Sequence, residues 1–251
     1  MAGSAGKIEL IRPDWPAAPR IAAAATTRAG GHSIGSFTGL NLAEHVGDEP
    51  ERVARNRRIL AAELNLPEAP RWLKQVHGEQ VVDAAQLSVP TAADAIISAT
   101  PGQVCAVLTA DCLPVLLCDR QARHVAAIHA GWRGLLAGVV EASVEAFERR
   151  QVPASSILAW LGPAIGPSAY EVGNDVWELC SLRYPDCLSA LVSGRPEHWQ
   201  MDLYAVARGI LERAGVTSVY GGDYCTFADQ RFFSHRRDGV TGRQATLIWL
   251  Q

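Results

Sequence analysis

Cys112 and His129 are the two residues of this chain whose types and spacing most favour chemistry. Cys112 lies between two apolar runs, and His129 ends a third run that follows a polar turn at 119–123. An antiparallel hairpin centred between residues 120 and 121 pairs residues whose numbers sum to 241, which puts Cys112 opposite His129. A thiolate beside an imidazole is half of a metal site or an activated nucleophile pair. Because Pro114 cannot donate to a strand ladder, we also expect a bulge or a sheet edge directly after Cys112.

His77 is a candidate third ligand from another part of the chain. It follows a stretch at 71–76 that we expect to be a strand, and it precedes a glycine, so its ring is exposed enough to bind a ligand. A lone histidine in such a position is more often a surface or capping residue. Glu79 completes a His-x-Glu pattern that zinc deaminases also have, but their Pro-Cys-x-x-Cys motif is missing from the sequence.

The segment after His129 has the pattern of an anion site. A predicted strand ends in Gly131, and a Gly-x-x-Gly turn then opens a predicted helix over 135–150. Free backbone N–H groups and the positive end of a helix dipole favour an anion such as phosphate there. Arg133 would add a bidentate donor. The same pattern also fits a tight connection with no ligand.

A third motif, Gly31 to Gly35, matches the G-x-S-x-G pattern of the nucleophile elbow, which needs a strand before it and a helix after it. The residues that follow have no helical period. We therefore interpret this stretch as a flexible glycine loop and not as part of a serine hydrolase.

Composition limits the classes of protein to consider. The chain has 251 residues, is 48% hydrophobic and carries a net charge of −3, so it can bury a full core but has no basic field for nucleic acid. It has no signal-peptide pattern and no apolar run of membrane-spanning length, so we expect a cytoplasmic protein without a membrane partner. Six cysteines without a C-x-x-C fit reduced thiols. We expect four of them in the core: Cys105, Cys118, Cys180 and Cys187.

The elements that must position these residues follow from periodicity and from start and stop signals. We expect strands at 8–11, 21–27, 71–76, 94–98, 104–109, 157–161, 216–220 and 244–250. We expect helices over 135–150, 174–183 and 202–214, and one that is N-capped by Asp48 and ends before Pro67. The strands at 94–98 and 104–109 are apolar on both faces, as in a covered sheet. The tail at 232–239 is expected to be a polar loop, and the whole chain, 1–251, a single domain of mixed α and β.

Taken in order along the chain, several blocks together resemble the YfiH family. They are TTRAGG at 26–31, LNL at 40–42 with HVGD at 45–48, QVHG at 75–78, ADCLPV at 110–115, HAGWRG at 129–134, GPAIG at 162–166 with YEV at 170–172, and FSHRR at 233–237 with TGRQA at 241–245. The family has been labelled laccase-domain or multicopper polyphenol oxidase, and later purine nucleoside phosphorylase. The similarity covers nearly the whole chain.

The resemblance implies an α+β fold in which mixed sheets are packed between helices in a layered α/β/β/α sandwich. It implies one metal site made by His77, Cys112 and His129, with Cys112 and His77 also in catalysis. It further implies that Arg236 or Arg237 of the tail acts in catalysis. The motifs and the Gly-x-x-Gly turn give three candidate substrate-binding residues: Arg28, Asn41 and Arg133.

Two imidazoles and a thiolate leave the fourth position of a tetrahedral zinc ion open, which is typical of catalytic sites. The resemblance implies phosphorolysis of adenosine, inosine, guanosine and methylthioadenosine, together with deamination of adenosine. The small-molecule partners would then be a nucleoside and phosphate.

Three alternatives stay open at this stage. Relatives that correct peptidoglycan precursors suggest a zinc amidohydrolase. The older label suggests a copper-dependent oxidase of phenols, but a multicopper enzyme needs several His-rich copper sites, and the chain has seven histidines and no His-x-His pair. The chain could also bind a metal without turnover.

Overall fold

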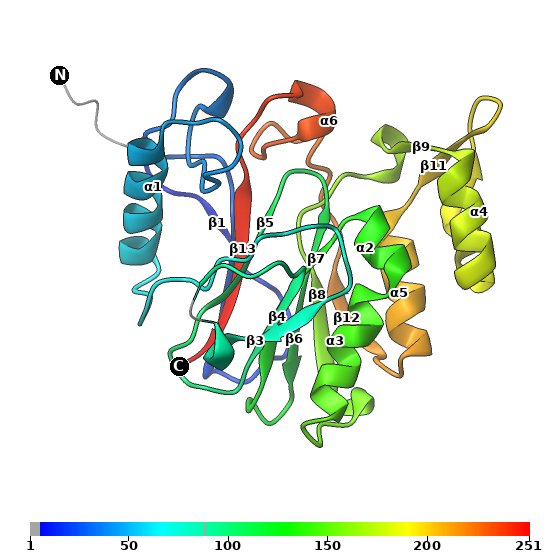
Figure 1. The fold of residues 1–251 in the computed structure, drawn as a ribbon, viewed down its shortest axis with the longest axis horizontal. Coiled ribbons are helices and arrows are strands. Elements are labelled where there is room, and N and C mark those ends of the chain that lie inside the picture. Colours follow the sequence, from blue (N-terminus) through cyan, green and yellow to red (C-terminus); the bar gives the residue numbers. More distant parts are fainter. Residues whose placement is uncertain (1–5, 88) are drawn as a thin grey trace.

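Two sheets packed face to face form the middle of the protein, with helices on both outer sides (Figure 1). The computed structural model describes residues 6–87 and 89–251. The first sheet has the order β1-β2-β13-β5, all antiparallel, and its strands are β1 (Leu10–Ile11), β2 (Ile21–Thr26), β13 (Gln244–Leu250) and β5 (Cys105–Thr109).

The second sheet is mixed and has the order β12-β8-β6-β7-β4-β3. Its strands are β12 (Ser218–Gly221), β8 (Ile157–Leu161), β6 (Leu113–Asp119), β7 (Val125–Ala130), β4 (Ala95–Ser98) and β3 (Val81–Asp83). The pairs at the two edges are parallel, and the inner pairs are antiparallel. A small third sheet consists of β10 (Leu191–Ser193), β11 (His198–Met201) and β9 (Glu171–Gly173).

The helices are α1 (Pro50–Glu63), α2 (Trp132–Ala137), α3 (Val139–Glu148), α4 (Asn174–Arg183), α5 (Leu203–Arg213) and α6 (His235–Asp238). Short 3-10 turns lie at Gly35–Phe37, Ala84–Gln86, Ala154–Ser156, Pro167–Ala169 and Pro185–Ala190. Among the residues that the structure describes, no helix combines the length and the apolar character needed to cross a bilayer.

Successive side chains along each strand point to opposite faces of its sheet and so contribute to different layers. In β6, Leu116 and Cys118 pack between the two sheets, whereas Val115 and Leu117 pack against the layer that contains α2 to α5. On the far side of the first sheet, α1 packs through Leu60 and neighbouring apolar residues. The expected α/β/β/α arrangement is confirmed. The two strands predicted to be covered on both faces, β4 and β5, are buried along their whole length.

The hairpin of β6 and β7 forms, but its predicted register is wrong by two positions. Pro114, not Cys112, lies opposite His129. Cys118 pairs with Val125 and not with Arg123, so the turn contains two more residues than predicted. The Asp119 carboxylate stabilises this longer turn by accepting hydrogen bonds from the backbone of Arg123 and His124 at 2.7 Å each. Since the shift is an even number, Cys112 keeps the sheet face of His129.

The expected bulge or sheet edge directly after Cys112 is also wrong. The strand β6 lies inside its sheet between β7 and β8, and its pairing with β7 is continuous from Leu113 to Cys118. Pairing with β8 begins only at Val115, one residue beyond Pro114. The missing N–H of the proline therefore falls where the ladder to β8 ends, a position that proline tolerates.

The stretch at 71–76 is not a strand and makes only isolated bridges at Arg71 and Lys74. The Gln75 side chain takes the place of a ladder: its amide nitrogen donates to the Leu108 carbonyl and its oxygen accepts from the Leu108 N–H, both at 2.8 Å. Side-chain pairing of this kind leaves no periodic signal in the sequence.

Other boundaries differ for local reasons. The helix expected over 135–150 begins earlier and is broken into α2 and α3 at Gly138, whose φ is +111°. Glu49, not Asp48, occupies the N-cap of α1, because the Asp48 carboxylate accepts hydrogen bonds from Ser33 and Asn41 instead. The tail expected to be a polar loop is wrong in part, since Phe232, Phe233 and Ser234 are fully buried and the next four residues form α6.

The loop of the G-x-S-x-G motif leads into a short 3-10 turn and not an α-helix, as expected. The four cysteines predicted for the core are buried, and all six cysteines are free thiols.

Candidate metal centre

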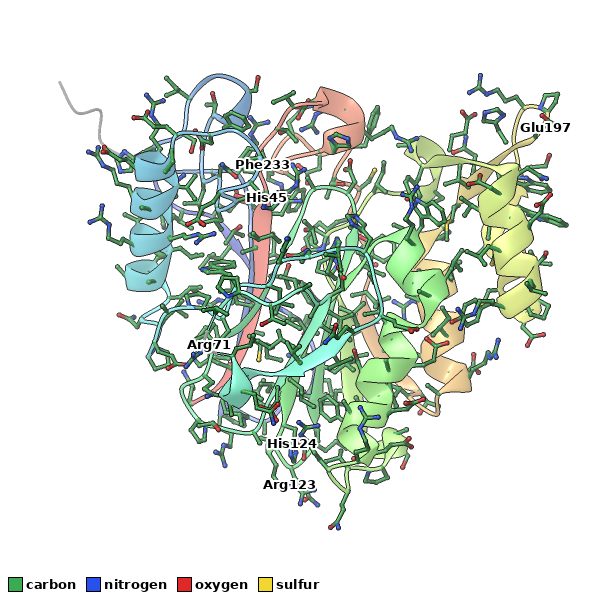
Figure 2. All side chains as sticks on the ribbon, in the orientation of Figure 1. His45, Arg71, Arg123, His124, Glu197 and Phe233 are labelled. Carbon is green, nitrogen blue, oxygen red and sulfur yellow. The ribbon has the colours of Figure 1, made fainter. Side chains whose placement is uncertain are left out.

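Two loops and the end of a strand meet at one end of the sandwich and bring His77, Cys112 and His129 together. Cys112 lies in the turn between β5 and β6, His129 is near the end of β7, and His77 comes from the loop before β3. Their ligand atoms all lie within 4.8 Å of one another, and they are the single such group of donors within residues 6–87 and 89–251. In Figure 2, Arg123 and His124 mark the opposite end of the sandwich, where β6 turns into β7.

His129 is fixed by a buried carboxylate. Its Nδ1 donates to Asp94 Oδ1 at 2.8 Å, and both side chains are nearly inaccessible to solvent. Because Asp94 engages Nδ1, Nε2 is the ring nitrogen left to face the other two donors. Burial alone would lower the His129 pKa, but Cys112 and Asp94 raise it to about 9, so Nε2 would release its proton when a metal binds. Burial alone would raise the Asp94 pKa, but the bonds from His129 and from backbone N–H groups lower it overall, so the carboxylate stays ionised.

The same carboxylate holds the loop that carries His77. The backbone N–H of His77 donates to Asp94 Oδ1 at 2.9 Å, and that of Gly78 donates to Oδ2 at 2.7 Å. His77 has a φ of +61°, a left-handed conformation that needs such support in a residue with a side chain. Its ring packs edge-on against His129, with centroids 4.7 Å apart.

Cys112 follows another left-handed residue, Asp111, whose φ is +90°. The Asp111 carboxylate is anchored by the Thr226 hydroxyl at 2.6 Å and by the backbone N–H of Arg236 at 2.7 Å. Burial raises the Cys112 pKa, but His129 and the hydrogen bonds from both imidazoles outweigh it and bring the pKa down to about 6. The thiolate is the form that binds metals, so this environment favours coordination.

Gly131 leaves room for the ligands. A Cβ at this position would lie 2.9 Å from Cys112 Sγ and 2.9 Å from His77 Cδ2. Its φ of −66° is open to any residue, so the need for glycine here is purely steric.

The donor set fits zinc. Neighbouring ligand atoms of a tetrahedral zinc ion lie roughly 3.3–3.6 Å apart, given Zn–N and Zn–S bond lengths of about 2.0 and 2.3 Å. Cys112 Sγ lies 3.8 Å from His77 Nε2, so small side-chain rotations bring the set to bonding geometry. Two imidazoles and one thiolate, one imidazole being oriented by a carboxylate, form a usual zinc environment.

Two cavities adjoin the centre. The Arg243 cavity, about 350 Å³, is lined by the three donors together with His45, Gln75, Leu108, Thr109, Ala110, Arg133, His235 and Arg243. The Tyr170 cavity, about 190 Å³, is lined by His77, Cys112, Ala110, Asp111, Trp132, Arg133, Tyr170, His235 and Arg236. His77 and Cys112 border both cavities, so two ligands bound in them would meet at the candidate metal.

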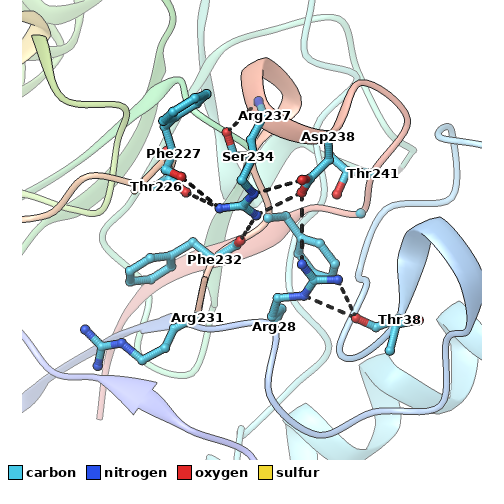
Figure 3. Close-up of polar contacts among 12 residues, drawn as sticks. Arg28, Thr38, Thr226, Phe227, Arg231, Phe232, Ser234, Arg237, Asp238 and Thr241 are labelled. Atoms are coloured by element: carbon cyan, nitrogen blue, oxygen red, sulfur yellow. Dashed lines mark hydrogen bonds and ion pairs between the residues drawn. The ribbon is translucent and has the colours of Figure 1, made fainter. Parts of the chain in front are cut away.

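The two tail arginines have different surroundings. The Arg236 guanidinium lies 5.2 Å from the centroid of the Tyr170 ring and lines the Tyr170 cavity. Arg237 instead donates to the carbonyls of Thr226 and Phe232 and to both oxygens of Asp238 (Figure 3). Of the two, Arg236 is therefore the one that borders the site, and Arg237 holds the tail together.

Of the three predicted substrate-binding residues, only Arg133 lines the cavities. Arg133 lines both cavities, with its guanidinium 4.3 Å from the Trp132 ring centroid. Arg28 lies among the tail contacts and donates to the Thr38 carbonyl (Figure 3). Its guanidinium also lies over the Phe233 ring, 4.8 Å from the centroid. Asn41 is fully buried and is not part of either cavity lining.

Asp94, Tyr170, Arg243 and His45 border or support the site but were not among the predicted residues. Tyr170, Arg243 and His45 lie inside the motif blocks of the family. The sequence therefore pointed to these residues but did not indicate what they do. Asp94 lies at the start of an apolar strand, where a single carboxylate is unusual enough to draw notice.

Comparisons with known proteins show the family to which the chain belongs. The family model described as multi-copper polyphenol oxidoreductase laccase matches residues 22–251. A purine nucleoside phosphorylase of Pseudomonas aeruginosa is 50% identical over 243 residues, which cover 96% of this chain and 98% of that protein. Purine nucleoside phosphorylase YfiH of Escherichia coli is 47% identical over 244 residues, with coverage of 96% and 99%.

A solved structure has the same fold. The crystal structure of a Neisseria meningitidis protein superposes with a TM-score of 0.92 at 46% identity and covers 96% of this chain and 99% of that one. The chain therefore belongs to the YfiH family, as its motifs predict, and to the laccase-like domain family whose model it matches.

Proposed function

We propose that the protein is a zinc-dependent purine nucleoside phosphorylase acting on adenosine, inosine, guanosine and methylthioadenosine. The observation that carries this proposal is the junction of two cavities at His77 and Cys112. A phosphorylase must bring together a nucleoside and an anion, and two cavities that share the candidate metal ligands suit two substrates. The names of the relatives support the same activity.

The residues of this chain have separate tasks in the proposed reaction. His77, Cys112 and His129 would hold zinc, which supplies a Lewis acid with one open position when bound. Trp132 and Tyr170 offer aromatic surface for the purine. A phosphate oxygen forms a bond to the ribose C1′ as the bond from C1′ to the base nitrogen breaks, and the base leaves with that electron pair and gains a proton.

The test is to incubate zinc-loaded protein with inosine or adenosine, with and without phosphate, and to separate the products by chromatography. We expect free base and ribose 1-phosphate only when phosphate is present. Cys112→Ala should abolish the reaction, while Cys180→Ala, a matched change at a buried cysteine in α4, should not. Lack of turnover of any purine nucleoside would contradict the proposal.

Adenosine deamination belongs to the same proposal, and inosine formed without phosphate is its readout.

The alternatives are an amidohydrolase of cell-wall precursors and a copper-dependent phenol oxidase. One group of three donors within the described residues supports a single mononuclear centre, while a multicopper oxidase needs further His-rich sites. We further propose a cytoplasmic location, because six free thiols fit a reducing compartment.

A further inference from the structure

The Arg243 cavity has an unusual balance of charge. Arg133 and Arg243 line it together with His45, and none of its lining residues is acidic. It lies at the end of the sandwich where Figure 2 shows His45 and Phe233. Among the described residues of the lining, the one anionic group is the Cys112 thiolate, whose charge the candidate metal would neutralise, so this concave cationic site attracts an anion.

Arg243 is the cation with the most unused capacity. It takes part in none of the ion pairs formed among residues 6–87 and 89–251. Only one of its guanidinium nitrogens is engaged, donating at 2.9 Å to the carbonyls of Thr241 and Gly242 in its own loop. Burial lowers the Arg243 pKa, with Cys112 and Asp111 acting in the opposite sense. A partly desolvated guanidinium with free N–H donors is poised for a bidentate anion.

The main chain at Arg243 is held rigidly. Its backbone N–H donates to Asn41 Oδ1 at 2.9 Å, and Asn41 Nδ2 donates to the Asp48 carboxylate at 2.8 Å. Gly242, before it, has no space for a side chain, because a Cβ would lie 2.8 Å from the Phe233 ring. Asn41 does not line the cavity but fixes the backbone of Arg243. The guanidinium is therefore preorganised for a ligand.

A second polar group in the lining lacks a partner. Thr109 is 1% exposed, and its hydroxyl has no hydrogen-bond partner within the described residues. Buried hydroxyl groups are rarely left unpaired, and such exceptions often mark a ligand site. Thr109 ends β5, three residues before Cys112.

Arg236, by contrast, is largely occupied. Its two terminal nitrogens donate to the Glu171 carbonyl at 3.1 Å, and its plane lies near the Tyr170 ring. It suits the nucleoside side of the site better than the anion side.

We propose that the Arg243 cavity is the subsite for inorganic phosphate, with Arg243 as its main ligand and Arg133 and Thr109 as further donors. The inference rests on the proposed phosphorylase function and adds to it the position of the anion. Phosphate then approaches the candidate metal from the Arg243 side, and the purine occupies the Tyr170 cavity.

The test measures equilibrium binding of inorganic phosphate to zinc-loaded protein by calorimetry, without nucleoside. Arg243→Gln should weaken binding about tenfold to hundredfold, as expected for loss of a charged hydrogen-bonded pair, and Arg243→Lys should weaken it less. Arg149→Gln, which removes an exposed charge at the C-cap of α3, should bind like the wild type. Zinc content and circular dichroism confirm that each variant is folded and loaded.

The outcomes separate the two proposals. Wild-type phosphate affinity in a folded Arg243→Gln variant would overturn the subsite, as would a wild-type protein that does not bind phosphate. If the wild type releases base from nucleosides and Arg243→Gln keeps its phosphate affinity, the subsite fails alone. If Arg243→Gln loses phosphate binding and the wild type converts no nucleoside, the subsite stands and the phosphorylase proposal fails.

Discussion

Asp94 connects two of the three candidate ligands through one carboxylate. One oxygen accepts hydrogen bonds from both the His129 ring and the His77 backbone. Removing the charge of Asp94 would weaken both the hydrogen bond that orients His129 and those that hold the strained His77 loop. The carboxylate therefore acts on the metal through the ligands and not by direct coordination.

We expect Asp94→Asn to lower zinc affinity about tenfold to hundredfold, the usual effect of losing a carboxylate behind a histidine ligand. The measurement is competition for zinc with a chromophoric chelator. Asp119→Asn is the matched control, because Asp119 is an equally buried carboxylate that caps the turn at the opposite end of the sandwich. Equal zinc affinity in wild type and Asp94→Asn would contradict this role.

The tail arginines should respond differently to truncation. Arg236→Ala should reduce kcat/KM about a hundredfold, equivalent to about 3 kcal/mol, with zinc content and Tm nearly unchanged. Arg237→Ala should instead lower the free energy of unfolding by about 2–3 kcal/mol, because the Thr226 and Phe232 carbonyls and the Asp238 carboxylate lose their donor. Steady-state kinetics and thermal unfolding of both variants decide between these roles. The reverse pattern would show that the assignments are exchanged.

At the scale of elements, the ligands depend on how closely the start of α2 approaches the turn between β5 and β6. Gly131→Ala puts a methyl group against Cys112 and His77 and should reduce bound zinc well below one equivalent without unfolding the protein. Gly78→Ala is the control, since a Cβ there would make only ordinary contacts at 3.6 and 3.7 Å. Elemental analysis of both purified variants provides the measurement, and full zinc in Gly131→Ala would count against the steric argument.

The strands with continuous apolar runs were predictable, because a short, continuously apolar stretch is typical of a strand that is buried on both faces. The hairpin was predictable too, but its register was not, since it depends on Asp119 bonding to the turn backbone. The failed strand at 71–76 depends on Gln75 pairing across 33 positions. Side-chain contacts over such distances have no local pattern. Proximity of Cys112 and His129 survived the error because the shift kept both on one sheet face.

At the scale of the molecule, the α/β/β/α sandwich confines the candidate chemistry to one end. The strands β5, β6 and β7 contribute their termini to that end, and the buried layers below keep these termini fixed. The residues around the candidate metal come from regions far apart in the sequence, from His45 to Arg243. The motifs were enough to predict the three ligands. The hydrogen bonds of Asp94, and the absence of an ion pair at Arg243 within the described residues, could be seen only in the folded structure.

The composition of the donor set predicts the metal. Protein purified without added metal should contain about one equivalent of zinc, because a thiolate and two imidazoles suit this ion. Cys112→Ala should lose it, whereas Cys187→Ala, a buried cysteine remote from the centre, should keep it at a stability cost of order 1 kcal/mol. A full complement of copper with a strong visible absorption band would contradict zinc as the resident metal.

The most direct test of the central claim is to restore zinc stepwise to chelator-treated protein and to follow phosphate-dependent release of base from inosine. The account predicts that turnover rises in proportion to zinc up to about one equivalent and then stays constant, and that Cys112→Ala recovers nothing. Full turnover in the metal-free protein, or turnover restored by copper and not by zinc, would contradict it.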